Sequence, residues 1–280
     1  RVSNPLLVLD ASGRIILGNE GKPRDVVGWM DNHDRAVRLL EDAAEKMGIA
    51  SADPNRRNTK PKNFGGSFGG GQTEPANIAM GSHADTINSL RDHDVFKRIA
   101  AYIDRGFKTF QPDLYEYYED YMGQLRRACP DLRWNFERNV FAAGTFNFGP
   151  QSIASVHTDD KNLAFGWCAV MALGDFDPRK GGHLVLWDLK LVMEFPPGTV
   201  MFIPSAILRH SNTTIAPGEK RMSFTQFSAG GPFRWVDCGM QTQKSFFEQG
   251  RKHTKTGAQR WLDGVGLYSQ WESLLAKTRE

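Results

Sequence analysis

The sequence predicts an α+β fold in which N-terminal helices support a β-rich core. Helical periodicity dominates the chain before residue 139, and short β-prone runs separated by turn residues dominate it afterwards. The 280 residues, 40% hydrophobic and 24% charged, have the composition of a globular protein and can bury a full core. Because many short strands in series form sandwiches or barrels, we expect a closed or layered sheet after residue 139.

A hairpin and a helix are predicted first. Apolar runs at residues 6–10 and 15–17 flank the turn Ala11-Ser12-Gly13, which is typical of a β-hairpin. Residues 34–47 have helical periodicity, and Gly48 supplies a C-terminal stop. We expect these elements to precede the core.

Two amphipathic helices are predicted at residues 85–105 and 112–128, where apolar residues recur at helical spacing. The second helix carries four tyrosines, at positions 115, 117, 118 and 121. Such a cluster can form a base-stacking platform or pack in a core. We assign these tyrosines to the core, against the sheet.

The segment between these parts is basic and then rich in glycine, so we predict a loop over residues 51–71. Its cations could bind phosphates, or they could be the solvated charges of a linker. Composition alone does not decide between the two. The cations are Arg56, Arg57, Lys60 and Lys62.

The β-rich part contains seven predicted strands, with turn signals such as Pro196-Pro197-Gly198 between them. After Gly239 the chain is polar, and only a short helix is predicted, near residues 270–277. Its basic cluster at 251–255 is more typical of a solvated surface than of a DNA contact. The predicted strands span residues 140–148, 164–173, 183–187, 191–195, 199–203, 208–213 and 221–228.

Two histidines and one aspartate form a candidate metal site in this part. Residues i and i+2 of a strand point to the same side, so His157 and Asp159 can reach one ion, and His210 from a later strand can complete the set. Two imidazoles and one carboxylate are typical of non-haem iron sites with open positions. The similar His83-Ala84-Asp85 lies at a predicted helix start, where i and i+2 diverge, and we interpret it as a cap region.

Arg221 and Ser223 lie on one face of the last predicted strand. A guanidinium binds a carboxylate through two hydrogen bonds, so Arg221 is a candidate anchor for a dicarboxylate co-substrate. Taken alone, His210 could be a core histidine and Arg221 a surface cation. The four residue types in this order favour a site, and His183 is expected to pack or to support the ligands rather than to bind metal.

Bulk properties exclude several classes of protein. Three cysteines without paired spacing argue against a disulfide framework and against a structural zinc cluster. The longest apolar run, residues 163–173, is too short for a membrane helix. A net charge of +3 and a pI near 8.7 are compatible with a polyanionic partner. Because the first residue is Arg1, the sequence leaves open whether a targeting segment precedes it.

The motif set resembles that of 2-oxoglutarate oxygenases with a double-stranded β-helix (jelly-roll) core, and within them the TET/JBP family, particularly its fungal TET-like branch. The resemblance implies Fe(II) bound by His157, Asp159 and His210, and 2-oxoglutarate bound by Arg221 and Ser223. It rests on His157-Thr158-Asp159, Phe68-Gly69-Gly70-Gly71-Gln72, Gly174-Asp175-Phe176-Asp177-Pro178, Gly182-His183-Leu184-Val185-Leu186, Pro197-Gly198-Thr199-Val200, His210, Gly218 and Arg221-Met222-Ser223-Phe224-Thr225-Gln226.

The implied reaction is oxidation of a methylated base in DNA by dioxygen, usually 5-methylcytosine to 5-hydroxymethylcytosine, and the resemblance leaves open whether oxidation goes further. Asn162 would face the target base, and residues 56–72, including Gln72, would contact DNA and fill the gap left by a flipped base. The chain lacks the Cys-rich region of animal TET proteins, so their substrate preference does not transfer. N6-methyladenine demethylation, a protein or small-molecule hydroxylase and a non-catalytic binding module remain alternatives.

We therefore expect a monomeric, nuclear, DNA-binding enzyme with one integrated catalytic domain, the nuclear location being implied by the resemblance alone. Its expected parts are residues 1–50 (hairpin and helix), 51–138 (basic glycine-rich loop and supporting helices), 139–238 (double-stranded β-helix core) and 239–280 (polar tail with a short helix).

Overall fold

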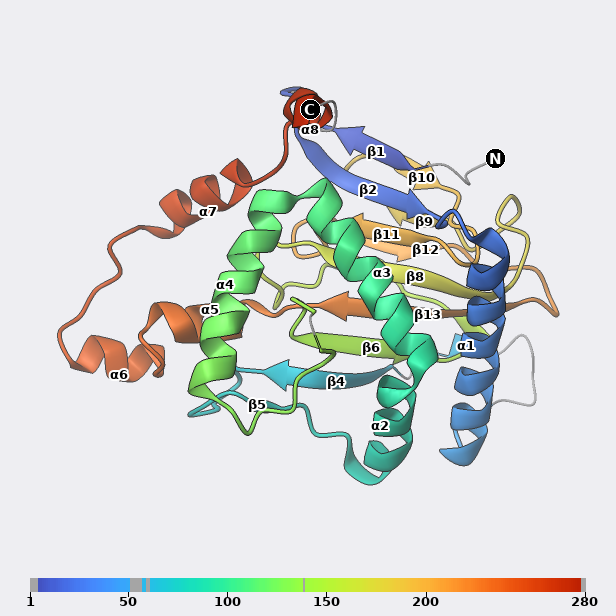
Figure 1. Cartoon of the computed structure of the whole chain (residues 1–280), viewed down its shortest axis with the longest axis horizontal. Helices are drawn as coiled ribbons and strands as arrows, with labels where there is room; N and C mark the ends of the chain where they lie inside the picture. Colours follow the sequence, from blue (N-terminus) through green and yellow to red (C-terminus); the bar gives the residue numbers. More distant parts are fainter. Residues whose placement is uncertain (1–4, 51–56, 59–60, 138, 278–280) are drawn as a thin grey trace.

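The computed structural model describes residues 5–50, 57–58, 61–137 and 139–277. Two sheets form the core (Figure 1). The main sheet has ten strands in the order β1-β2-β11-β8-β13-β6-β4-β5, with β3 and β7 off this path, and the smaller sheet has the order β10-β9-β12. The strands are β1 (Leu6–Leu9), β2 (Ile15–Gly21), β3 (Arg57–Asn58), β4 (Lys62–Ser67), β5 (Ala76–Asn77), β6 (Ala143–Asn147), β7 (Gln151–Ser152), β8 (Cys168–Asp175), β9 (Leu184–Leu186), β10 (Leu191–Met193), β11 (Val200–Ile203), β12 (His210–Asn212) and β13 (Lys220–Phe227).

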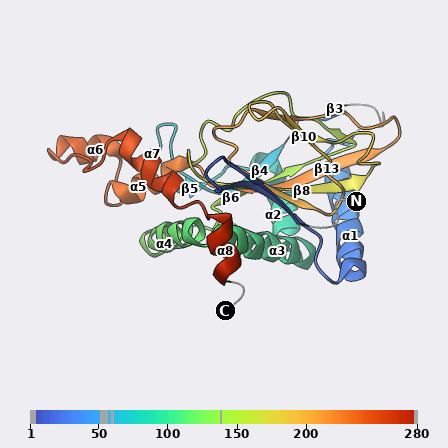
Figure 2. The same ribbon diagram turned by 90° about the horizontal axis from the view of Figure 1, so that it is seen from above.

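Helices cover one face of the main sheet. Figure 2 shows α3 and α4 on one side of this sheet and β10 of the smaller sheet on the other side. Among the helices that the structure describes, none is long and apolar enough to cross a bilayer. The helices are α1 (Val26–Lys46), the 3-10 turn η1 (Gly81–His83), α2 (Ala84–Asp92), α3 (Asp94–Phe110), α4 (Pro112–Ala128), α5 (Gly230–Asp237), α6 (Gln243–Glu248), α7 (Gly257–Gly266) and α8 (Trp271–Lys277).

Two apolar layers hold the sheets and helices together. Between the helices and the main sheet, Phe64, Phe96, Phe146 and Phe224 are fully buried, with Phe146 and Phe224 ring centroids 5.4 Å apart. A second cluster, which includes Leu184 and Leu186 of β9 together with Leu17, Met201 and Ile203 of the main sheet, joins the two sheets. Residues of both sheets also line a cavity, which is described below.

The predicted hairpin and seven later strands are confirmed, with ends displaced by a few residues. The predicted helix at 85–105 is wrong as a single element, since it is interrupted at His93. The backbone of His93 is extended (φ −73, ψ 137), and its Nδ1 accepts a hydrogen bond from the Val95 N–H at 3.2 Å. A local cap of this kind ends one helix and starts the next, which apolar periodicity does not reveal.

The glycine-rich segment is only partly a loop. Residues 62–67 form β4, which pairs antiparallel with β6, so the predicted loop over 51–71 is wrong for this stretch. Gly65 has φ +103, and a Cβ there would lie 2.4 Å from the Ala142 carbonyl oxygen. The glycine therefore permits a close approach of two backbones rather than flexibility.

Of the remaining expectations about helices and buried residues, some are confirmed and others are not. Tyr115 and Tyr118 are buried in the core, and Tyr117 and Tyr121 are partly buried and pack against it, in agreement with the assignment of the four tyrosines to the core. The α1 helix begins at Val26, earlier than predicted, where the Asp25 side chain accepts from the Gly28 N–H. The short helix near the C-terminus is present as α8, whereas α6 and α7, which extend away from the sheets in Figure 1, were not predicted.

Candidate metal centre and adjoining cavity

His157, Asp159 and His210 lie close together and line one cavity. One ligand atom from each residue lies within 4.8 Å of the other two. The two histidines form an antiparallel bridge, with backbone N–H to O distances of 3.1 and 2.9 Å in the two directions. Asp159 Oδ1 is 3.6 Å from His157 Nε2. The three residue types predicted from the sequence therefore converge on one point.

The local backbone differs from the one used to predict the site. His157 is a single bridge residue, and Asp159 lies in an irregular segment rather than on a strand. Asp159 is held there by its N–H, which donates to the Ser205 carbonyl oxygen at 2.9 Å. The convergence is confirmed, but the i and i+2 strand geometry that we expected is not its cause.

Both imidazoles are oriented for metal binding by backbone carbonyls. His157 Nδ1 is 2.7 Å from the Ser155 oxygen, and His210 Nδ1 is 2.9 Å from the Leu208 oxygen. Since a carbonyl only accepts, Nδ1 carries the proton in each ring and Nε2 keeps its lone pair. Burial also lowers the pKa of His210, which favours the neutral form that binds metal.

The donor set fits iron(II). Two neutral imidazole nitrogens and one carboxylate oxygen suit a non-haem iron centre, and a set of three leaves coordination positions for other ligands. His83 and Asp85 lie at the start of α2, away from this group, as predicted. His183 belongs to the backbone ladder with Thr213 and is not part of the metal group.

A cavity of about 830 Å³ opens beside the three residues and reaches Arg221. Arg221 is 4% exposed, its Nη1 donates to the Ser152 carbonyl oxygen at 3.0 Å, and its Nε has no partner among the described residues. Burial lowers the pKa of this guanidinium to about 10, so it stays positive at neutral pH. A buried cation with an unused donor requires an anion or a polar group.

Polar side chains line the wall of the cavity next to Arg221. The Oγ of Ser223, predicted to act with Arg221, accepts a hydrogen bond from Asn147 Nδ2 at 3.0 Å. Sequence reasoning missed Asn147, Thr145 and Thr225, all of which line the cavity. Thr225 could have been found, because it follows Ser223 by two residues on the same strand and so shares its face.

The structure places the predicted DNA-binding residues in different parts of the molecule, and their contacts with DNA stay predictions. Asn162 lines the cavity, and its Nδ2 donates to Asp159 Oδ2 at 3.4 Å and to Ser205 Oγ at 3.2 Å. Lys62 in β4 and Gln72 in the following turn do not line the cavity. Arg57 belongs to the short strand β3. Arg56 and Lys60 lie outside the described residues.

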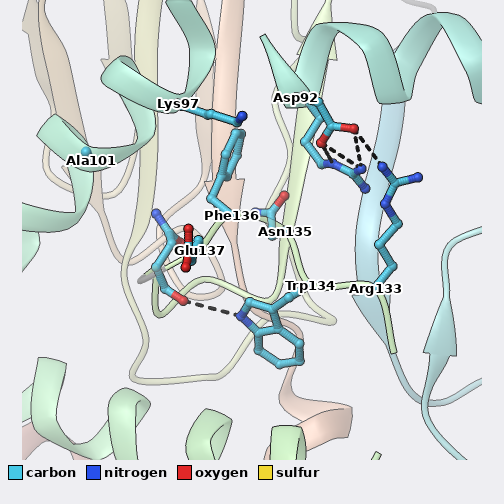
Figure 3. Close-up of a pocket in the computed structure, with 10 residues that line it drawn as sticks. Asp92, Lys97, Ala101, Arg133, Trp134, Asn135, Phe136 and Glu137 are labelled. Carbon is cyan, nitrogen blue, oxygen red and sulfur yellow. Dashed lines mark hydrogen bonds and ion pairs between the residues drawn. The ribbon is translucent and has the colours of Figure 1, made fainter. Parts of the chain in front are cut away.

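A second, smaller cavity of about 360 Å³ lies under the loop that follows α4 (Figure 3). Arg91 and Arg133 both donate to the carboxylate of Asp92, at distances from 2.6 to 3.0 Å. Two of the cations that line this cavity, Arg91 and Arg133, are therefore paired with an acid of the same cavity. Asn135, 2% exposed, lines this cavity too, and neither amide atom has a partner among the described residues. Among the described residues that line this cavity, there is no group of metal-binding side chains.

No protein-family model and no curated protein matches the sequence. Among solved structures, the chain is similar to NgTET1 in complex with 5mC DNA, with a TM-score of 0.59 and 16% identity over 88% of this chain and 84% of that one. Lower similarity is found to OsALKBH1 (TM-score 0.41, 12% identity, 80% and 100% covered) and to a collagen prolyl hydroxylase of Paramecium bursaria Chlorella virus-1 (TM-score 0.32, 14% identity, 70% and 90% covered).

At 16% identity the similarity to NgTET1 concerns the fold. The fold expected from the sequence is confirmed, and the fungal branch remains a prediction. The chain therefore has a double-stranded β-helix fold similar to that of NgTET1, with two histidines and one aspartate converging at the cavity.

Proposed function

We propose that this protein is an iron(II)- and 2-oxoglutarate-dependent dioxygenase that oxidises a methylated base in DNA, converting 5-methylcytosine to 5-hydroxymethylcytosine. The observation that carries this proposal is the shared cavity. It joins a His-Asp-His ligand set to a buried arginine whose Nε lacks a partner among the described residues. A metal site and an anion site in one cavity suit a metal-bound dicarboxylate.

The protein's own residues bind and orient the co-substrate. Arg221 offers a planar fork to the distal carboxylate of 2-oxoglutarate, and Ser223 adds a hydroxyl from the same strand face. Bound iron supplies dioxygen chemistry, with 2-oxoglutarate converted to succinate and carbon dioxide. Burial of Arg221 strengthens the ion pair, because little water reaches the guanidinium to screen it.

The orientation of the Asn162 amide favours a substrate base that carries an amino group. Its amide nitrogen faces the Asp159 carboxylate, which only accepts hydrogen bonds, so the orientation of the amide is determined by chemistry. The amide oxygen is then the end left for a substrate. An oxygen accepts from the exocyclic amino group of cytosine but not from the carbonyl at the same position of thymine.

The DNA part of the proposal has further support. The NgTET1 structure, which has a similar fold, contains 5mC DNA, and the net charge of this chain is +3. A methyl group inside a duplex is inaccessible to a cavity between two sheets, so the target nucleotide would have to be flipped out of the stack. The protein would act as a monomer in the nucleus.

The test is incubation of the protein with iron(II), 2-oxoglutarate and a duplex containing 5-methylcytosine, followed by mass spectrometry of the nucleosides and measurement of succinate. Hydroxymethylcytosine and succinate in equal amounts are expected. Oxidation restricted to a duplex with N6-methyladenine, with release of formaldehyde, would transfer the proposal to that base. Succinate formation that is independent of both duplexes would exclude DNA as the substrate.

A further inference from the structure

The two carboxylate oxygens of Asp159 have different neighbours. Oδ1 is on the side of the metal group, 3.6 Å from His157 Nε2. Oδ2 is 3.4 Å from Asn162 Nδ2, which donates to it. One oxygen therefore faces the position of an ion, and the other is held within the protein.

Asn162 is itself fixed at several points. Its Nδ2 also donates to Ser205 Oγ at 3.2 Å, and its backbone N–H donates to the Asp159 carbonyl oxygen at 2.8 Å. An isolated bridge pairs Asn162 with Ala229, just beyond β13. The amide is thus held by the aspartate and by the buried Ser205, while the backbone of Asn162 is held against the segment just beyond β13.

Ser205 contacts Asp159 by a second route. Its carbonyl oxygen accepts the Asp159 N–H at 2.9 Å, while its hydroxyl holds the amide that reaches the Asp159 carboxylate. Ser205 is 1% exposed, so its own position is set by packing. A closed ring of contacts therefore connects the backbone and the side chain of the metal-facing aspartate.

We infer that Asn162 and Ser205 are positioning residues that hold Asp159 with a single oxygen directed at the metal. A carboxylate rotates broadly about its terminal torsion, so an unsupported aspartate could bind with both oxygens or turn away. Holding Oδ2 keeps one more coordination position open. This inference rests on the metal site of the proposed function and does not depend on which substrate is oxidised.

The test is the affinity of the metal-free protein for Mn²⁺ alone, measured by calorimetry without DNA or 2-oxoglutarate. Loss of a side chain that orients a metal ligand weakens binding on the order of 10- to 100-fold, and we expect this for Asn162→Leu. Ser205→Ala should lose less, because the amide still reaches Oδ2, and Ser205→Thr, which keeps the hydroxyl, should restore affinity. Asn135→Leu is the matched control, since it removes a buried amide in the other cavity (Figure 3), and it should bind Mn²⁺ like the wild type.

The visible spectrum of the Co²⁺ form gives a second readout that a purely structural role would not move. Asn162→Leu should change the intensity of the cobalt bands, because a second Asp159 oxygen entering the coordination sphere alters the ligand field. Wild-type Mn²⁺ affinity together with an unchanged cobalt spectrum in this variant would overturn the inference. The wild-type protein could bind metal and yet oxidise no DNA. In that case, weakened Mn²⁺ binding by Asn162→Leu would support the inference, and only the DNA proposal would be rejected.

Discussion

The two faces of the main sheet have opposite characters, and strand β13 contributes to both. Successive side chains of β13 point to opposite faces of the sheet. The helical face receives Met222, Phe224 and Gln226, and the cavity is lined by Arg221, Ser223 and Thr225. The helical face is mostly apolar and aromatic, and the cavity face is polar. Because side chains alternate along a strand, one segment can stabilise the fold and organise chemistry at the same time. The two functions should therefore be separable by mutation.

The sharpest separation is expected for Asp159→Ala on the cavity face. Removal of one of three metal ligands should abolish turnover, with less than about 1% of the wild-type rate remaining. Affinity for methylated duplex DNA should stay within about twofold, because phosphate contacts dominate it. Nucleoside mass spectrometry and a binding titration at fixed salt measure the two effects. Oxidation at the wild-type rate would refute the metal assignment.

For Phe224→Ala on the helical face, we expect a loss of stability rather than the loss of a metal ligand. Phe224 is fully buried, with ring centroids 5.4 Å from Phe146 and 5.6 Å from Phe96. Its truncation should lower the free energy of unfolding by about 3–5 kcal/mol, the usual cost of removing a core phenylalanine. Urea denaturation measures this loss. Phe247→Ala is the control, because Phe247 is 49% exposed and its loss should cost less than about 0.5 kcal/mol.

An intermediate effect is expected for Arg221→Lys, which keeps the charge but loses the planar fork. The KM for 2-oxoglutarate should rise on the order of 10-fold or more, because a lysine cannot bind a carboxylate through two parallel hydrogen bonds. Steady-state kinetics at varied 2-oxoglutarate concentration measure it. Lys220→Met alters the exposed neighbouring cation and should leave this KM unchanged. Equal KM values for all three proteins would contradict the role of Arg221.

The smallest effect is expected for Glu20, whose carboxyl group lies on the otherwise apolar helical face. Burial raises its pKa to about 8, with a partial opposing effect from Arg105, and its Oε2 has no partner among the described residues. A folded pKa above the unfolded value means that the protonated form is favoured by folding. The resulting stability is complete below about pH 4.5 and is lost as the pH rises towards 8.

Glu20→Gln should therefore be more stable than the wild type at pH 8, and the difference should vanish near pH 4.5. Urea denaturation at the two pH values measures it. A difference that does not depend on pH would show that Glu20 is equally protonated, or equally solvated, in both states. In that case the helical face would contain no buried charge at this position.

The later strands could be predicted because their apolar residues alternate and turn residues separate them. The candidate ligands could be predicted because few residue types suit a metal, although the irregular backbone at Asp159 could not. Strand β4 was missed because Gly65 and Gly66 indicate a loop locally, while the partner that makes them a strand is distant in sequence. Ser205 was missed for a related reason, since its contacts with Asp159 and Asn162 arise only from tertiary structure.

Gly65 also limits how this protein can change in evolution. Any side chain there would meet the backbone of the strand beside it, and even alanine would require that strand to move. We expect descendants and relatives of this protein to retain glycine at the position while the neighbouring residues diverge. A residue without a side chain would then be a more durable marker of common ancestry than the charged residues nearby.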